Sequence, residues 1–111
     1  MRVLGIDPGL TRCGIGIVDS VGPQKLQMIS VGVIKTDIDA ELEIRLMQLE
    51  KELLVWIKEF KPDVIAVERV FSQLNVRTAM ATGQAAGVAL ILAAKAGIPV
   101  VVDKPMGRTL K

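Results

Sequence analysis

The sequence predicts one α/β domain built on a mixed five-stranded sheet, because short apolar runs and two helical segments follow in the order β-β-β-α-β-α-β. Residues 2–7, 14–18 and 26–34 predict three strands joined by two tight turns, which indicates an antiparallel meander. Residues 64–68 and 99–102 predict two further strands, each of which follows a helix and is therefore reached by a crossover connection. We expect residues 1–111 to form this single domain.

The first helical segment is expected from about Ala40 to Phe60. Asp37 or Asp39 is the expected N-cap, and Pro62 is expected to end the helix. Apolar residues recur along the segment at spacings of 4, 3, 4, 3 and 4, which is typical of one buried stripe on a helix: Leu42, Leu46, Leu49, Leu53, Trp56 and Phe60.

The second helical segment, Thr78 to Ala94, carries no charged residue and is rich in alanine and glycine. It is too short and too rich in small residues to predict a membrane span. Gly83 and Gly87 lie about one helical turn apart, so another backbone can approach this surface closely. Packing on the sheet is the first interpretation, and packing against a second copy of the helix is the alternative.

The composition excludes several kinds of chemistry. Cys13 is the only cysteine and there is no histidine, which excludes an internal disulfide, a Cys/His zinc site and histidine acid–base catalysis. Nothing at the amino terminus resembles a signal peptide, so a reduced, cytoplasmic compartment is expected. Residues 36–63 carry eight acidic against four basic residues, and the rest carries ten basic against four acidic. This distribution suits a polyanionic substrate, although an ordinary mixed surface explains it equally.

Two acidic residues each close a short apolar run: Asp7 follows residues 3–6, and Glu68 follows residues 64–67. Ligands collect beyond the carboxyl ends of such strands in open α/β sheets. If the two strands are neighbours, the carboxylates repel each other by about 4 kcal/mol at about 4 Å and an effective dielectric of about 20. A divalent metal is the usual compensation. The alternative is an Asp in a turn and an unrelated Glu that caps a helix.

Three motifs carry a resemblance to a known family. The element order and the Gly-Ile-Asp-Pro-Gly sequence resemble the RNase H-like superfamily. Residues 4–16, Leu-Gly-Ile-Asp-Pro-Gly-Leu-Thr-Arg-Cys-Gly-Ile-Gly, look like the opening of the RuvC family of Holliday-junction resolvases. Residues 65–75, Ile-Ala-Val-Glu-Arg-Val-Phe-Ser-Gln-Leu-Asn, look like its second acidic motif, and residues 83–88 are similar to its dimer-interface helix. The resemblance covers residues 1 to about 102.

The resemblance implies an enzyme that cuts two strands of a four-way DNA junction symmetrically with two Mg²⁺ ions per active site. It implies that Asp7 and Glu68 are catalytic metal ligands, and that Phe71, Asn75 and Arg77 contact DNA. Carboxylates are suitable ligands for Mg²⁺, and a projecting Phe can stack on an unpaired base. For Phe71 alone, burial under the sheet is an equally good interpretation.

The resemblance also implies a homodimer, with Gly83, Gln84 and Gly87 at its interface, and a branch-migration helicase complex as a partner. The family carries further acids on C-terminal helices, so we expect an RNase H-like sheet in which those helices are missing. Asp19 is expected at the far end of its strand from Asp7, and Asp103 is the remaining acid near the site.

Two other functions stay open. One is a dimerising, junction-binding protein whose metal site is incomplete. The other is a phosphate-binding half of an actin-like kinase or ATPase, although the sequence shows neither a second Asp-Gly phosphate loop nor the residues of an adenosine pocket.

Overall fold

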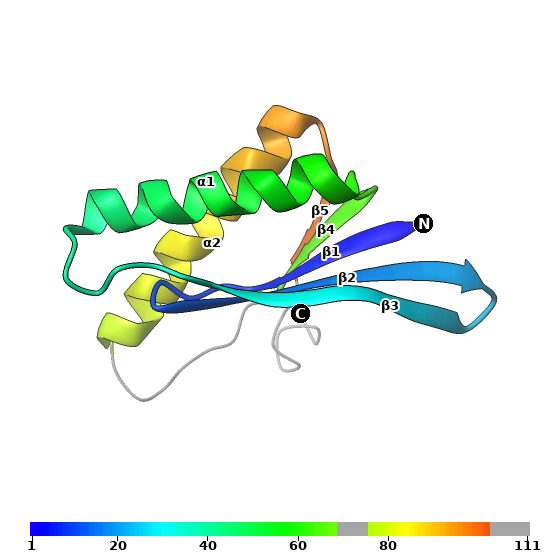
Figure 1. Cartoon of the computed structure of the whole chain (residues 1–111), viewed down its shortest axis with the longest axis horizontal. Helices are drawn as coiled ribbons and strands as arrows, with labels where there is room; N and C mark the ends of the chain where they lie inside the picture. The colour runs from blue at the N-terminus through cyan, green and yellow to red at the C-terminus, as the bar shows by residue number, and fades with distance from the viewer. Residues whose placement is uncertain (69–75, 103–111) are drawn as a thin grey trace, which may run out of the picture.

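The structure is a computed structural model that describes residues 1–68 and 76–102. Five strands form one sheet in the order β3-β2-β1-β4-β5, with both helices on one of its faces (Figure 1). The element order confirms the sequence prediction: β1 (Arg2–Asp7), β2 (Arg12–Gly22), β3 (Lys25–Lys35), α1 (Leu42–Phe60), β4 (Val64–Val67), α2 (Val76–Ala96) and β5 (Val100–Val102).

Strand β1 lies at the centre of the sheet, and Asp7 stands at its carboxyl end. It pairs antiparallel with β2 and parallel with β4, so that Ile6 stands beside Ile15 on one side and Val67 on the other. Strand β5 then adds in parallel beside β4. The meander and the crossovers expected from the sequence are both present, and the two acid-terminated strands are neighbours.

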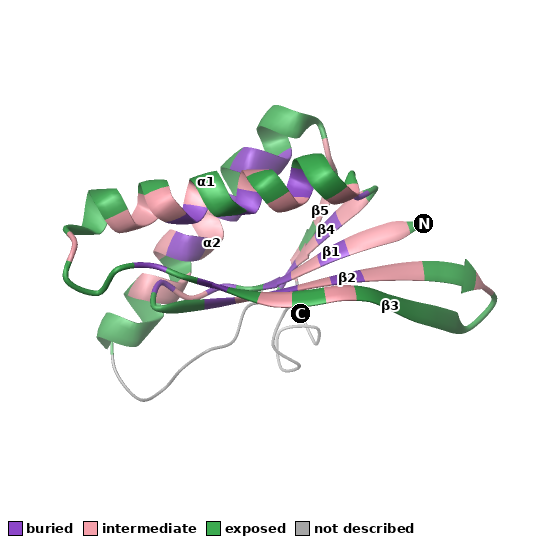
Figure 2. Ribbon diagram, in the orientation of Figure 1, coloured by how far each residue is buried: buried purple, intermediate pink, exposed green. Residues whose placement is uncertain are grey.

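Alternate residues of the central strands separate the two faces of the sheet. The face under the helices is aliphatic, and its side chains join those of the helices in one core. Buried residues lie on the strands and on both helices (Figure 2). Fully burying one such side chain contributes about 1.5–3 kcal/mol, so this face supplies most of the stabilisation. The buried aliphatic residues of the strands are Leu4, Ile6, Ile15, Ile17, Ile34, Ile65 and Val67, and Cys13 of β2 is buried with them.

Helix α1 begins at Leu42, two residues after the expected start, and the capping prediction is wrong. Glu41 occupies the N-cap position, and its side chain makes no capping hydrogen bond. The Asp37 carboxylate instead accepts a hydrogen bond from the backbone N–H of Asp39 at 3.0 Å, which forms a local turn before the helix. At the other end, Lys61 adopts a left-handed conformation, and Pro62 follows it as expected.

The apolar stripe of α1 is only partly confirmed. Leu49 and Leu53 are fully buried, and Ile57, which the regular spacing left out, is buried with them. Leu42 is 42% exposed, because the first turn of α1 extends beyond the buried face. Trp56 is half-buried and lies so close to β3 that a Cβ at Gly32 would stand 2.7 Å from its ring.

Helix α2 begins at Val76 and ends at Ala96, so it is longer than expected at both ends. It has 21 residues, and an 18-residue window within it has a mean hydropathy of 1.3, so by length and composition alone the helix could cross a membrane, and length does not argue against a span. The helix nevertheless packs against α1 and β4, with Ala85, Ala89 and Leu92 buried. The prediction that Gly83 and Gly87 pack on the sheet is wrong, because a Cβ on either glycine would meet no atom within 4 Å.

Strand β2 runs well beyond its expected range, β3 exceeds its range by one residue at each end, and together they form a hairpin that projects past the helices (Figure 1). Their pairing shifts register between Ile17 and Val18 and again between Ser20 and Gly22. Beyond the first shift the hairpin leaves the core, and Leu26 and Met28 are mostly exposed. The backbone ladder, rather than apolar burial, therefore holds the outer part of the hairpin.

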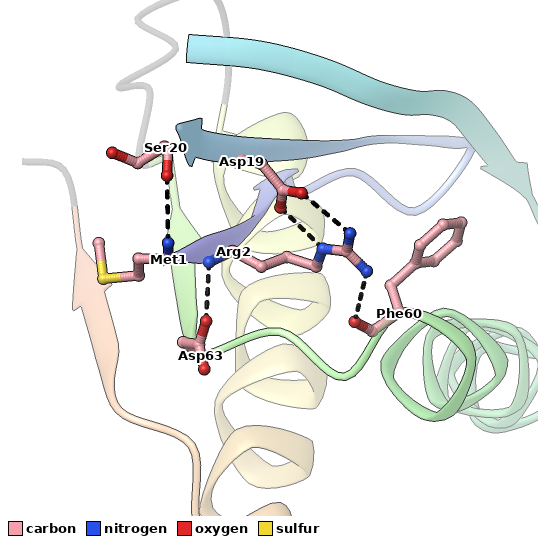
Figure 3. A network of polar contacts seen from close by, with 6 residues as sticks. All are labelled: Met1, Arg2, Asp19, Ser20, Phe60 and Asp63. Atoms are coloured by element: carbon pink, nitrogen blue, oxygen red, sulfur yellow. Dashed lines mark hydrogen bonds and ion pairs between the residues drawn. The ribbon is translucent and has the colours of Figure 1, made fainter. Parts of the chain in front are cut away.

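Charged groups fasten the amino end of β1 (Figure 3). The Arg2 guanidinium donates to both carboxylate oxygens of Asp19, at 2.8 and 2.9 Å, and to the carbonyl of Phe60 at 3.1 Å. The backbone N–H of Arg2 donates to the Asp63 carboxylate at 2.7 Å. The hydrogen bonds from Arg2 lower the pKa of Asp19, and the same contact raises the pKa of Arg2. Three elements are thus joined at this end of the sheet.

Candidate metal-binding site

Asp7 and Glu68 lie side by side at the carboxyl ends of two central strands. Ile6 and Val67 are register partners in the parallel pair β1–β4, and the backbone N–H of Glu68 donates to the Ile6 carbonyl at 2.9 Å. Both acidic side chains are exposed, and both line the same hollow of about 500 Å³. The two acids that lie 61 positions apart in the sequence therefore share one site.

Glycines form much of the floor of this hollow. Gly14 is the register partner of Asp7, and a Cβ there would lie 3.4 Å from the Cβ of Asp7. Gly5 and Gly16 pair beside it, and a Cβ at Gly16 would meet no atom within 4 Å. Without side chains at these positions, the face of the sheet beside the carboxylates stays open to a ligand.

The turn after Asp7 is tightly held. Gly9 is required in it, because a Cβ at that position would collide with the carbonyl oxygen of Arg12. The buried hydroxyl of Thr36 donates to the Leu10 carbonyl at 2.6 Å and ties the turn to the end of β3. The middle of the turn is therefore fixed, and the backbone of Asp7 before it is held by pairing with Gly14 in β2.

The thiol of Cys13 lies close to the site without taking part in it. Burial raises its pKa, an effect that the hydrogen bond from the Gly9 backbone reduces and the negative charge of Asp7 strengthens. Because the thiolate is the form that binds metals, a buried and protonated thiol is a core residue here.

The chemistry of the donors fits Mg²⁺, which takes carboxylate oxygens and retains several water ligands. Among the described residues, neither the Asp7 nor the Glu68 carboxylate has a hydrogen-bond or ion-pair partner, so their oxygens are available. The same residues contain no group of three or more acidic, cysteine or histidine side chains that could hold an ion. Asp19 lies at the opposite end of the sheet as expected, and Asp103 falls outside the described residues.

Only one of the three expected DNA contacts lies among the described residues. Phe71 and Asn75 lie outside the described residues, whereas Arg77 is exposed in the first turn of α2. Arg77 shares a second hollow with Arg12 and Arg45, neither of which is among the site residues predicted from the sequence. Arg12 stands five residues after Asp7, and this closeness in the sequence could have identified it as a candidate site residue. Arg45 lies in an ordinary amphipathic helix, and nothing in its spacing distinguishes it.

A mixed sheet whose two central parallel strands each end in an acid, with the helices on one face, defines the RNase H-like class of α/β proteins. The solved structure of T. thermophilus RuvC in complex with a Holliday junction substrate superposes with a TM-score of 0.87 and 34% sequence identity, over 96% of this chain and 64% of that one. The family model for crossover junction endodeoxyribonuclease RuvC matches residues 3–107. The chain belongs to the RuvC family.

Two curated relatives carry the name crossover junction endodeoxyribonuclease RuvC. The one from Streptomyces avermitilis is 54% identical over 105 residues, and the one from Streptomyces griseus is 55% identical over 105 residues. The alignments cover 95% of this chain but 60% and 52% of the relatives. The chain thus spans somewhat more than half the length of the curated relatives it matches.

Proposed function

We propose that the chain is a Mg²⁺-dependent endonuclease domain that cuts four-way DNA junctions in recombination and repair. One observation carries the proposal: Asp7 and Glu68 end adjacent parallel strands and line one hollow, in a chain of the RuvC family. The name of the relatives and the junction bound to T. thermophilus RuvC support the choice of substrate.

Asp7 and Glu68 are the residues that would hold the metal. Metal ions held there would supply the charge that activates a water molecule and stabilises the leaving oxygen of a phosphodiester. The glycine floor leaves room for a strand to approach the carboxylates, and the pairing of β1 with β2 holds the backbone of Asp7 in place. A backbone that is already ordered at the ligands lowers the cost of assembling the site when the substrate binds.

The remaining contacts extend the proposal to DNA and to a second copy of the chain. Arg77 is exposed in the first turn of α2 and is proposed to contact the phosphate backbone, with Phe71 and Asn75 as further DNA contacts. Gly83, Gln84 and Gly87 are proposed to form a homodimer interface, because α2 leaves open space over both glycines. A dimer would bring two active sites to one junction, one for each of the two strand cuts. A branch-migration helicase as partner and a cytoplasmic location follow from the family resemblance.

A second function has one observation in its favour. The described residues bring only two carboxylates together, and each of two ions would then have few anionic ligands. The alternative is a dimerising protein that binds the junction without cutting it.

A cleavage assay separates these two functions. The 111-residue protein is mixed with a labelled synthetic four-way junction, with Mg²⁺ or with EDTA, and both binding and strand cutting are measured. Symmetric nicks that need Mg²⁺ support the endonuclease. Tight binding to the junction without nicks supports the non-cutting alternative, and equal affinity for the junction and for a linear duplex contradicts both.

A further inference from the structure

A second hollow, of about 910 Å³, lies on the other side of the turn that follows Asp7. The β1–β2 turn, the first half of α1 and the first half of α2 form its walls. Three arginines line it, Arg12 from the start of β2, Arg45 from α1 and Arg77 from α2, and no acidic residue is among its described lining residues. The fold thus gathers three positive charges that lie 33 and 32 positions apart in the chain.

Arg45 is held in position by polar contacts that leave part of its guanidinium free. Its Nε donates to the Thr36 hydroxyl at 3.0 Å, and its Nη2 donates to the Thr11 hydroxyl at 3.2 Å. A guanidinium has five N–H groups, and the other groups of Arg45 have no acceptor within the described part of the chain. An arginine that is already ordered loses less conformational entropy when it binds an anion.

Arg12 and Arg77 are exposed, and neither has an acidic partner among residues 1–68 and 76–102. Arg2 gives the contrast, since both carboxylate oxygens of Asp19 neutralise it. Like charges that share a hollow without a counter-charge repel one another, and an anion in the hollow removes that repulsion. The amino end of α2, which has no acidic residue in its first turn, adds further positive potential.

The position of the hollow indicates the kind of anion. Pro8 and Gly9 line it and follow Asp7 directly in the chain, so the turn separates the carboxylates from the arginines by a few residues. Phosphates of one DNA strand follow one another at about 3.4 Å along the helix axis. A DNA strand that has one phosphate at the carboxylates and runs past this turn would bring its neighbouring phosphates to the arginines.

We propose that the hollow lined by Arg12, Arg45 and Arg77 binds the phosphodiester backbone of a duplex arm of DNA, at phosphates next to the one that faces Asp7 and Glu68. Arg12 and Arg77 make the phosphate contacts, and Arg45 adds a third charge while it fixes the turn. The choice of DNA rests on the proposed function. The contacts themselves read no base sequence, because phosphates are the same at every step.

The test uses a linear duplex of about 20 base pairs, so that neither a junction nor cleavage is needed. Binding is measured by fluorescence anisotropy in EDTA from about 50 to 200 mM salt for the wild type, Arg12→Ala, Arg77→Ala and their double variant. Each single substitution should weaken binding several-fold and reduce the slope of log K against log salt by about 0.9, and the double variant by about 1.8.

Lys95→Ala is the matched control, because it removes one exposed positive charge at the far end of α2. It should leave affinity and slope close to those of the wild type. A loss equal to that of the arginine variants would overturn the proposal, as would unchanged binding in the double variant or no binding of the duplex by the wild type. Thermal unfolding checks that all variants are folded.

Inorganic phosphate, added at constant ionic strength, distinguishes the backbone from a small phosphate ligand. The backbone proposal expects weak competition, and complete displacement of the duplex by millimolar phosphate would contradict it. Failure of this site and failure of the proposed function are distinguishable. The function fails when the junction is neither bound selectively nor cut, whereas the arginine site fails when duplex binding does not depend on Arg12 and Arg77.

Discussion

Charged residues at the two ends of β1 are arranged in opposite ways, paired at the amino end and unpaired at the carboxyl end. At the amino end, Arg2 is the register partner of Asp19 and donates to both of its carboxylate oxygens. At the carboxyl end, Asp7 is the register partner of a glycine, and Glu68 stands beside it on the next strand. Opposite charges face each other at one end, and like charges share the other.

This difference separates stability from function within one strand. The paired end joins β1, β2 and the connection from α1 to β4, and its hydrogen bonds are satisfied (Figure 3). The carboxylate end carries a repulsion that folding alone does not need. Charges kept unpaired in a folded protein are characteristic of binding and catalytic sites.

The largest expected effect is at the carboxylate end. Asp7→Asn should lower Mg²⁺-dependent junction cleavage by about 100-fold or more, because even outer contacts of a metal site are worth 10–100-fold. Junction binding should be equal or tighter, since one negative charge is removed. Asp39→Asn, an exposed Asp outside both hollows, is the control and should cut like the wild type. Cleavage retained by Asp7→Asn would contradict the role of Asp7 as a metal ligand.

A second comparison, between the covered and the open face of the sheet, also separates residues that stabilise the fold from those that leave room for a ligand. Gly32→Ala should lower the free energy of unfolding by about 1–3 kcal/mol, because the added Cβ would lie 2.7 Å from the Trp56 ring. Gly16→Ala, on the open face, meets no atom within 4 Å and should change it by less than about 0.5 kcal/mol. Urea unfolding measures both. Equal effects would mean that α1 does not press on β3 as described.

The turn after Asp7 offers a smaller test of the carboxylate end. Thr36→Val should cost about 1–2 kcal/mol in unfolding free energy, since it removes the hydroxyl that donates to the Leu10 carbonyl. Thr11→Val loses only an exposed acceptor for Arg45 and should cost less. If the two variants unfold at the same denaturant concentration, the buried hydroxyl does not hold the turn.

The smallest effect is expected at the paired end and depends on pH. The Arg2 contact lowers the pKa of Asp19 in the folded state, so its stabilisation is present above the unfolded pKa of about 3.9. It is lost as the pH falls through the folded pKa. Asp19→Asn should therefore lower Tm by a few degrees at pH 7, and the difference from the wild type should shrink below about pH 4. A difference that grows in acid would reverse the assigned direction.

Local sequence patterns were sufficient to predict the order of the elements and the two acidic residues of the site. Apolar runs and alternation depend only on neighbouring residues, and the same patterns placed Asp7 and Glu68 at strand ends. The capping prediction failed because the Asp37 side chain has a nearer donor, the N–H of Asp39. Leu42 is exposed because a regular spacing does not say how far a neighbouring layer extends.

The sequence by itself determined which residues end the strands, since hydrophobic periodicity is a property of the chain read locally. The tertiary structure decided that β4 pairs with β1, which brings Asp7 and Glu68 together. It also decided that Arg12, Arg45 and Arg77 share a hollow and that Gly83 and Gly87 face open space. The physical reason is that contacts between distant residues follow from how layers pack and which strands pair, and no local spacing encodes that choice.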